Sequence, residues 1–406
     1  MRFAVTAAAW ILAGALAGCA TSPAFTPRLS EPRLAVVNEA DLTEAQRDML
    51  ASRANLNIYR TLANHVDLYN RWSPLGQFLL NGSSISARHR EMAMLRMGWL
   101  CQSPYEWSQH ARIAKASAGM TEAEIRAIAA DPKSPLWSET DRAVLKMADE
   151  LRYDAMISDA TWAELKKTYS DQQIMELFYT SAQYQLVSMA LNTLGIQIEP
   201  EAVDFMPTDL PVPHAATRPA GPRLTTPRVA PILEPSWTPA QRAMITPQLR
   251  PDGEALNLYT TLLNHPKLYG PRARFGSYLQ RDSLLDPVTR ELAIMRTAWN
   301  IRASYEWAHH EQSARSAGLS PEQIAAIAIG PSAKVWDAKQ AAVLAAADEL
   351  RREAFLSDAT WAELAKHYSV KERIEIVYTV GGYTMTGLAI NSLGIQTEPG
   401  YPTMPN

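Results

Sequence analysis

The sequence contains one pattern twice, at a spacing of about two hundred residues. The segment Tyr105–Trp107 recurs at 305–307, and the segment 158–162 recurs at 357–361. The offset is 200 for the first of these pairs and 199 for the second, so one residue was lost between them. The repeat therefore covers many separate segments in the same order, which indicates duplication of a whole unit rather than of a short motif.

The repeat divides the chain into two domains with a spacer between them. The copies span 41–199 and 236–398, and each is long enough to bury its own core. Ten prolines occur between positions 200 and 239, with few long apolar residues and no helical period. Proline fixes φ and lacks an amide donor, so we expect 200–235 to be an extended, semi-rigid linker. A short C-terminal tail, 399–406, follows the second copy.

The N-terminus has the features of an export signal. Arg2 precedes an apolar stretch that is too short for a comfortable membrane span, so we interpret 1–18 as a lipoprotein signal peptide. Leu16-Ala17-Gly18-Cys19 resembles a bacterial lipobox, which implies cleavage before Cys19 and a lipid on its thiol. Residues 19–40 would then be a lipidated tether. The alternative is an ordinary secretory signal that contains a cysteine.

The residue after the cysteine indicates which membrane holds the protein, and the composition argues against one class of binding partner. In lipoproteins of this type a residue other than Asp after the cysteine, here Ala20, favours the outer membrane, so we expect a lipid-anchored protein that faces the periplasm. The net charge of −3 is unsegregated, which argues against nucleic acid as a partner. The chain has two cysteines, and with Cys19 lipidated Cys101 would have no disulfide partner.

The signals within each copy are helical throughout. Apolar residues recur at helical spacing in Met92, Leu95 and Trp99, and no alternating strand pattern separates such segments. We therefore predict an all-α fold with about seven or eight helices per copy. The segments Ile174–Leu194 and Ile374–Leu393 are longer and more apolar than a one-sided surface helix requires. We expect them to pack the copies together as a pseudo-symmetric pair, an intramolecular pseudo-dimer that higher homo-oligomers could extend.

A group of polar residues among these helical positions is the candidate site. Arg90-Glu91 is followed by Glu106 and His110, and all four recur in the second copy. Glu106 and His110 are four residues apart, so on one helix they share a face. A carboxylate beside an imidazole is suited to acid/base chemistry when burial moves either pKa toward neutrality. The alternative is a weak surface pair at i,i+4 spacing, with Arg90-Glu91 as a structural ion pair.

These residues also carry a resemblance to a known family. The segments 86–128 and 286–327, with Arg-Glu-Leu-Ala-Ile-Met-Arg and Tyr-Glu-Trp-Ala-His-His in the second, resemble the carboxymuconolactone decarboxylase and alkylhydroperoxidase D superfamily. The resemblance covers most of both copies and implies two tandem alkylhydroperoxidase D-like helical domains. It also implies that the site lies between helices, often near a subunit boundary.

The superfamily's peroxidase branch uses a Glu, a Cys-x-x-Cys and a His, and the dithiol is absent here. The two thiol positions are occupied by Ser103 and Glu106 in the first copy and by Ala303 and Glu306 in the second. Peroxide reduction by that route needs a thiolate, which none of these side chains supplies. Cys101 lies two residues away from the motif, and we interpret it as a buried small apolar residue. Peroxidase activity is therefore the disfavoured alternative.

The decarboxylase branch does not need the dithiol and works without a cofactor, so the resemblance favours a lyase or isomerase acting on a small carboxylated or lactone-type substrate. His110 and His310 are the predicted proton-transfer groups. The other predicted catalytic residues are Glu91, Glu106, Glu291 and Glu306, and the predicted substrate-binding residues are Arg96, Arg296, Tyr105, Trp107, Tyr305 and Trp307. No compact metal-ligand motif occurs, and we predict no metal. A non-catalytic binding or oligomerisation lipoprotein on the same fold remains the alternative function.

Two further histidines stand outside this group. His65 and His265 occur at equivalent positions, each followed closely by a tyrosine. We interpret them as packing residues at a helix end, with a role in the site as the alternative.

Overall fold

The computed structural model describes residues 29–51, 53 and 55–405, and this part of the chain contains helices and no strand. The prediction of an all-α fold is therefore confirmed. The predicted signal peptide, 1–18, and the predicted lipidation site, Cys19, lie outside the described residues. Among the helices that are described, none is long and apolar enough to cross a lipid bilayer.

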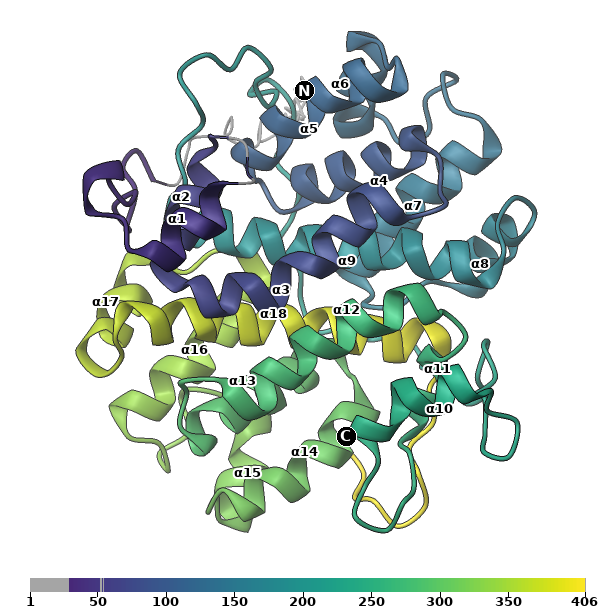
Figure 1. Cartoon of the computed structure of the whole chain (residues 1–406), viewed down its shortest axis with the longest axis vertical. Coiled ribbons are helices and arrows are strands. Elements are labelled where there is room, and N and C mark those ends of the chain that lie inside the picture. Colours follow the sequence, from purple (N-terminus) through teal and green to yellow (C-terminus); the bar gives the residue numbers. More distant parts are fainter. Residues whose placement is uncertain (1–28, 52, 54, 406) are drawn as a thin grey trace, which may run out of the picture.

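The two copies contain the same helices in the same order (Figure 1). The first copy comprises α1 (Glu44–Ala51), α2 (Asn57–Leu62), α3 (Val66–Gln77), α4 (Ala87–Leu100), α5 (Pro104–Ala118), α6 (Glu122–Ala130), α7 (Glu139–Tyr153), α8 (Asp159–Lys166) and α9 (Asp171–Leu194). The second comprises α10 (Pro239–Ile245), α11 (Asn257–Leu262), α12 (Pro266–Ser277), α13 (Pro287–Ile301), α14 (Ser304–Ser316), α15 (Pro321–Ile329), α16 (Ala338–Glu353), α17 (Asp358–His367) and α18 (Val370–Leu393). Each copy has more α-helices than the seven or eight predicted from the sequence. The additional ones are short helices such as α2 and α11, which have too few turns to show a period.

Local sequence signals set the ends of the helices that carry the core. Ser170 begins α9 with a capping box, in which its hydroxyl accepts from the amide of Gln173 and the Gln173 side chain accepts from the amide of Ser170. Gly195 ends the same helix in the left-handed region, at φ 69°, where a residue without Cβ is unstrained. Helix α18 begins and ends in the same way, at Ser369 and Gly394.

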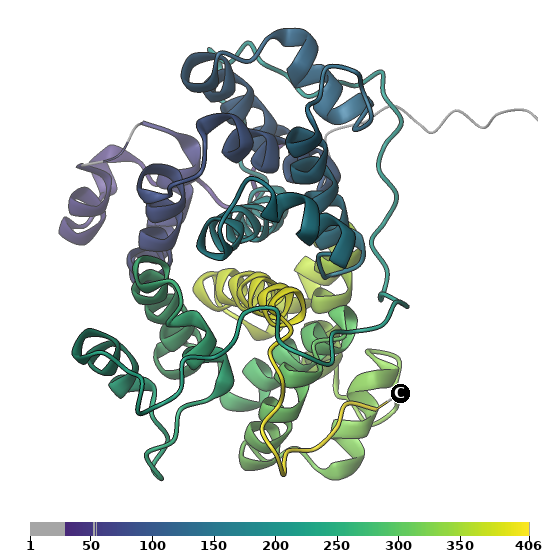
Figure 2. The ribbon, with the colours of Figure 1, turned by 90° about the vertical axis from the view of Figure 1, so that its right-hand side faces the viewer.

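Helices α9 and α18 lie side by side in the middle of the molecule and join the two copies (Figure 2). A Cβ at Gly381 of α18 would lie 2.6 Å from Cγ of Leu186 of α9, so the helices approach closely at this glycine. Nη1 of Arg152 donates to the carbonyl oxygen of Arg351 at 2.7 Å, and the guanidinium of Arg351 returns a hydrogen bond to the carbonyl of Arg152. The predicted packing of the copies as a pseudo-symmetric pair is confirmed.

The segments that precede each copy also take part in this packing. Within the predicted tether, Arg33 donates its amide to the carbonyl of Leu194 at 3.0 Å, and its guanidinium lies 2.6 Å from Asp358 of the second copy. Within the predicted linker, Arg228 makes the equivalent contacts with Leu393 and with Asp159 of the first copy. The repeat thus extends to Pro-Arg at 32–33 and 227–228, where an offset of 195 hides it from a comparison at 199 or 200.

Candidate active site

The candidate catalytic residues lie on two helices that fold back on each other. Helix α4 supplies Glu91 about one turn after its N-cap, Ser86, whose hydroxyl accepts from the amide of His89. Helix α5 starts at Pro104, a residue suited to the first helical position, and supplies Glu106 and His110. The turn between the helices brings the start of α4 beside the middle of α5. The structure therefore brings all three predicted catalytic residues of the first copy together.

In the first copy, His110 lies between the two carboxyl groups. Its Nδ1 is 2.7 Å from Oε2 of Glu91, and its Nε2 is 3.1 Å from Oε1 of Glu106. The second of these contacts lacks hydrogen-bond geometry, so Oε1 of Glu106 is left without a hydrogen bond. Glu91 is 0% exposed, Glu106 3% and His110 6%, and Nε of Arg90 contacts Oε1 of Glu91 at 3.2 Å. The interpretation as an exposed i,i+4 pair is therefore wrong.

Burial and the charges of their neighbours shift the pKa values of Glu91, Glu106 and His110 by different amounts. Burial raises the pKa of Glu91, but His110 and Arg90 outweigh that effect and hold it below its ordinary value. Burial raises the pKa of Glu106 to about 7, although the charge of His110 opposes this. Burial lowers the pKa of His110, but the charges of Glu91 and Glu106 outweigh it and raise the pKa overall. Near neutral pH the site thus holds an ionised Glu91, a Glu106 that can exchange its proton, and a His110 that keeps its proton to a higher pH than a free imidazole does.

The second copy reproduces half of this arrangement. Nδ1 of His310 lies 2.6 Å from Oε2 of Glu291, and Arg290 contacts the other oxygen of the same carboxylate at 3.4 Å. Neither oxygen of Glu306 has a hydrogen-bond partner, and this side chain is buried. Burial raises the pKa of Glu306 well above its ordinary value, with the charge of Arg272 opposing the shift. Burial thus favours the protonated form of Glu306.

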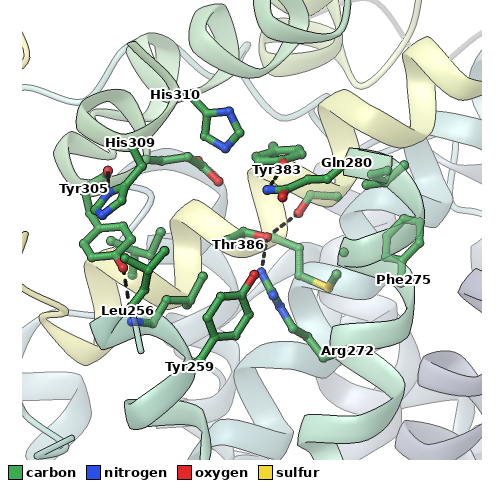
Figure 3. Close-up of a pocket in the computed structure, with 17 residues that line it drawn as sticks. Leu256, Tyr259, Arg272, Phe275, Gln280, Tyr305, His309, His310, Tyr383 and Thr386 are labelled. Carbon is green, nitrogen blue, oxygen red and sulfur yellow. Dashed lines mark hydrogen bonds between the residues drawn. The ribbon is translucent and has the colours of Figure 1, made fainter. Parts of the chain in front are cut away.

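Each set of residues opens onto a cavity of its own. The first cavity, of about 160 Å³, is lined by Glu106, His110 and the ring of Tyr105. The second, of about 70 Å³, is lined by the equivalent side chains of Tyr305, Glu306 and His310 (Figure 3). Each cavity lies within a single copy. The first lies between α5 and the helices around it, the second lies between α14 and the helices around it, and neither lies at the contact of α9 with α18.

Tyrosines on the central helices complete the two sites, and the sequence analysis missed them. The ring of Tyr184 on α9 stands edge-on to His110, with centroids 4.8 Å apart and planes at 88°. Tyr383 on α18 takes the same position against His310, at 5.0 Å and 89°. Both occur inside long apolar segments that were assigned to the core. Their recurrence as polar-tipped residues at an offset of 199 was the signal that could have revealed them.

The predicted substrate-binding arginines do not line the cavities. Arg96 is held by Asp149, with Nε at 2.7 Å from Oδ1, and its Nη1 donates to the carbonyl of Ile128 at 2.8 Å. Arg296 makes the equivalent contacts with Asp348 and with a carbonyl of α15. These guanidinium groups are used within the fold, because they tie α4 and α13 to neighbouring helices. The prediction that they bind a substrate carboxylate is not supported.

Of the aromatic residues predicted to bind the substrate, the tyrosines line the cavities and the tryptophans lie in the core. Trp107 and Trp307 are buried against Trp99 and Trp299 and do not line the cavities that hold the histidines, so their assignment to substrate binding is also unsupported. Tyr105 does line the cavity, and its hydroxyl donates to Oε1 of Glu199 at 2.7 Å.

Glu199 was missed because it follows the last helix of its copy. The same Oε1 accepts from the amide of Asn57 at 2.8 Å, which fixes the start of α2 at the cavity wall. Glu398 contacts Tyr305 and Asn257 in the same way in the second copy.

The positions that hold a dithiol in peroxidases contain no thiol here. Ser103 and Ala303 are buried, and Glu106 and Glu306 line the cavities. Cys101 is buried, with Sγ 3.8 Å from Sδ of Met97, as its interpretation as a small apolar residue requires. Within the described ranges no cluster of three or more His, Cys, Asp or Glu side chains is arranged to hold a metal ion.

Comparisons with known proteins give one family match and several solved structures. The carboxymuconolactone decarboxylase family matches residues 67–150 and again residues 266–349. No curated protein matches the chain. A solved structure described as an alkylhydroperoxidase AhpD core, an uncharacterised peroxidase-related protein from Ralstonia eutropha, is 19% identical with a TM-score of 0.39; the match covers 44% of this chain and 97% of that one.

Two further solved structures have similar scores. A protein of unknown function from Agrobacterium tumefaciens is 17% identical, with a TM-score of 0.32 over 34% of this chain and 94% of that chain. A debrominase solved in complex with 2,3,4-tribromopyrrole is also 17% identical, with a TM-score of 0.35 over 43% of this chain and 94% of that chain.

Proposed function

Because the chain belongs to the carboxymuconolactone decarboxylase family through two tandem domains, we propose that it is a cofactor-free lyase or isomerase. Its substrate is a small carboxylated or lactone-type molecule, and its chemistry is the transfer of protons by Glu and His. The observation that carries this proposal is the buried contact of His110 with both Glu91 and Glu106 at the wall of a cavity.

The protonation states of the first copy suit a reaction that moves a proton. Oε2 of Glu91 accepts a hydrogen bond from Nδ1 of His110, so Nε2, which faces Glu106, is the ring nitrogen that gains and loses a proton. An isomerisation removes a proton from one carbon of the substrate and returns one to another. A decarboxylation releases carbon dioxide and places a proton on the carbon that lost it. Glu106, with a pKa raised to about 7, can accept or donate that proton near neutral pH.

The second copy supports the same chemistry in a different starting state. Burial favours the protonated form of Glu306 beside the cavity, and Nδ1 of His310 is held by Glu291. A neutral, buried carboxylic acid is a ready proton donor to a substrate carbon or oxygen. We expect both copies to be competent for proton transfer, with different preferences for the substrate.

Two alternatives remain, and one observation bears on each. A non-catalytic binding protein would use the same cavities, and the unpaired oxygens of Glu306 would then serve only to recognise a ligand. A peroxidase is disfavoured because Ser103 and Ala303 stand where the mechanism needs a thiolate. If the protein reduced an organic hydroperoxide and lost this activity on Cys101→Ser, a peroxidase would become the favoured function.

We place this activity on an exported lipoprotein, anchored through Cys19 and facing the periplasm from the outer membrane. The support is the lipobox-like Leu16-Ala17-Gly18-Cys19 and the Ala20 that follows it.

Turnover of carboxylated unsaturated lactones and ring-cleavage products tests the proposal. Each compound is incubated with the wild type and with the double variant His110→Gln, His310→Gln, and products are followed by proton NMR. The single variants His110→Gln and His310→Gln show which copy works, and His214→Gln, an exposed histidine, is the matched control. We expect turnover in the wild type and the control and its loss in the double variant. Turnover that is unchanged in the double variant contradicts the proposed chemistry.

A further inference from the structure

The two cavities differ most at one position of the helix that forms their wall. Helix α3 presents Trp72 to the first cavity, and α12 presents Arg272 to the second, at the same place in the repeat. Each of these side chains is 6% exposed. Trp72 packs edge-on to Tyr69 and Tyr378, as a core aromatic does. Arg272 instead places a guanidinium group inside the second cavity, where Figure 3 shows it pointing toward Tyr259 and Thr386.

The Arg272 guanidinium is incompletely paired. Nη2 donates to Oγ1 of Thr386 at 2.9 Å, and no carboxylate oxygen of the described residues lies within 4.0 Å of the group. A guanidinium has five N–H donors, and burying it without an anion is costly. By contrast, the arginines that line the first cavity, Arg53 and Arg112, are not buried, and Arg53 stacks on the ring of Tyr69.

The carboxyl groups near the second cavity do not balance this charge. Glu291 is already engaged by His310 and Arg290. Glu306 lines the same cavity but lies more than 4.0 Å from the guanidinium nitrogens, and burial, opposed by the charge of Arg272, raises the pKa of Glu306 well above its ordinary value. Among the described residues, the cavity therefore contains a buried cation with no carboxylate in ion-pair contact with it.

Two neighbouring wall positions change in the same direction, although Gln183 of the first cavity is replaced by Gly382 in the second. Val187 in the first copy is replaced by Thr386 in the second, whose hydroxyl accepts a hydrogen bond from Nη2 of Arg272. Leu80 is replaced by Gln280, whose amide donates to the hydroxyl of Tyr383 at 2.9 Å. Three wall positions that are apolar in the first cavity are thus polar in the second.

We propose that the second cavity binds a small organic monocarboxylate through Arg272, with Thr386 positioning the guanidinium, and that the first cavity does not. The planar fork of a guanidinium matches a carboxylate with two parallel hydrogen bonds. One cation accompanied by neutral donors balances a monoanion, whereas a phosphate dianion would leave excess negative charge in a buried site. This inference deepens the proposed function, on which it rests, because it assigns carboxylate recognition to one copy and one residue.

Calorimetric titration of the full chain with carboxylates from propionate to benzoate, each against its amide, tests this assignment without turnover. We expect the best carboxylate to bind the wild type at one site per chain, about tenfold or more tighter than its amide and than inorganic phosphate. Arg272→Gln should remove this preference, and Arg272→Lys should retain part of it. Arg53→Gln, at the first cavity, should leave it unchanged.

Stability separates a binding role from a structural one. If Arg272 binds a ligand, Arg272→Gln should unfold at the same or a higher urea concentration than the ligand-free wild type, because the unpaired buried charge is removed. A wild type with no carboxylate preference across the series, or a preference that persists in Arg272→Gln, overturns the inference, as does preferential binding of phosphate. Arg272-dependent binding without any turnover would reject the proposed function and leave this inference standing.

Discussion

His65 of the first copy lies against Glu375 of the second, with Nε2 of the imidazole 2.8 Å from Oε1 of the carboxylate and both side chains buried. The reciprocal contact joins His265 to Glu176 at 2.9 Å. The packing role predicted for these histidines is thus a contact between the copies and not only one at a helix end. Each carboxylate also accepts from the loop before α4 or α13, at Ser84 or Ser283. The contact therefore connects the domain interface to the helices that carry Glu91 and Glu291.

Replacing Glu375 or Glu176 by Gln should destabilise the whole chain. Each substitution removes several hydrogen bonds to a buried charged group, so we expect a loss of roughly 2–3 kcal/mol in the free energy of unfolding. Urea unfolding of each variant measures it, and Glu322→Gln, on the exposed face of α15, is the control. Variants as stable as this control would show that the contact contributes nothing to the pairing of the copies.

The effect of Glu375→Gln should also depend on pH. Burial raises the pKa of Glu375, but hydrogen bonds from His65, Ser283 and Tyr278 outweigh it and lower the pKa overall. A carboxyl with a lowered folded pKa stabilises the fold above its unfolded value of 4.5, and the contribution is lost as the pH falls through the folded pKa. The difference between wild type and variant should therefore be full at neutral pH and shrink below about pH 4.5. A difference that grows in acid would contradict this assignment.

Glu106→Gln should change the stability in the opposite direction and make the chain more stable at higher pH. The folded pKa is raised to about 7 from 4.5, so the unfolded chain releases this proton at a lower pH than the folded chain does. The stability of the wild type therefore falls as the pH rises from 4.5 to about 7, and the loss persists above that. The variant removes this loss and should gain roughly 1–3 kcal/mol relative to wild type at about pH 8, with little change near pH 4.5. Urea unfolding at both pH values, with Glu44→Gln as an exposed control, measures the gain. No relative gain at the higher pH would show that Glu106 is already ionised.

Helical periodicity predicted the all-α class and half of the site, whereas the kind of helical domain was implied by the family resemblance. The i,i+4 spacing placed Glu106 beside His110, and the length and apolarity of Ile174–Leu194 indicated a central helix. The distance from Glu91 to His110 could not be predicted, because it depends on how α4 and α5 fold back on each other.

Features that depend on tertiary contacts were missed. Arg272 went unnoticed because the search followed residues shared by the copies, and its counterpart is Trp72. Arg96 was preferred as the substrate cation because it recurs, but its recurrence reflects an ion pair with Asp149 that only the packing of α4 on α7 reveals.

Lipidation is predicted to depend on a single thiol. Cells that express the full chain should incorporate a labelled fatty acid into the wild type, and Cys19→Ala should abolish the incorporation and release the protein from the membrane fraction. Cys101→Ala, at the other cysteine, is the matched control and should be labelled like the wild type. Label that persists in Cys19→Ala would show that the lipobox is misread.

The proposed chemistry depends most directly on the proton held by His110 between Glu91 and Glu106. Nitrogen-15 NMR of protein with labelled histidine reports this proton, and the His110 signals are assigned by their absence in His110→Gln. We predict that both ring nitrogens of His110 show imidazolium shifts below the ordinary pKa of 6.5, and that the imidazolium deprotonates at a pH above that value. In Glu91→Gln the titration should move to lower pH, because one of the two carboxylates that stabilise the cation is lost. A His110 in the wild type that titrates at or below 6.5, or one that titrates alike in Glu91→Gln, would contradict the account.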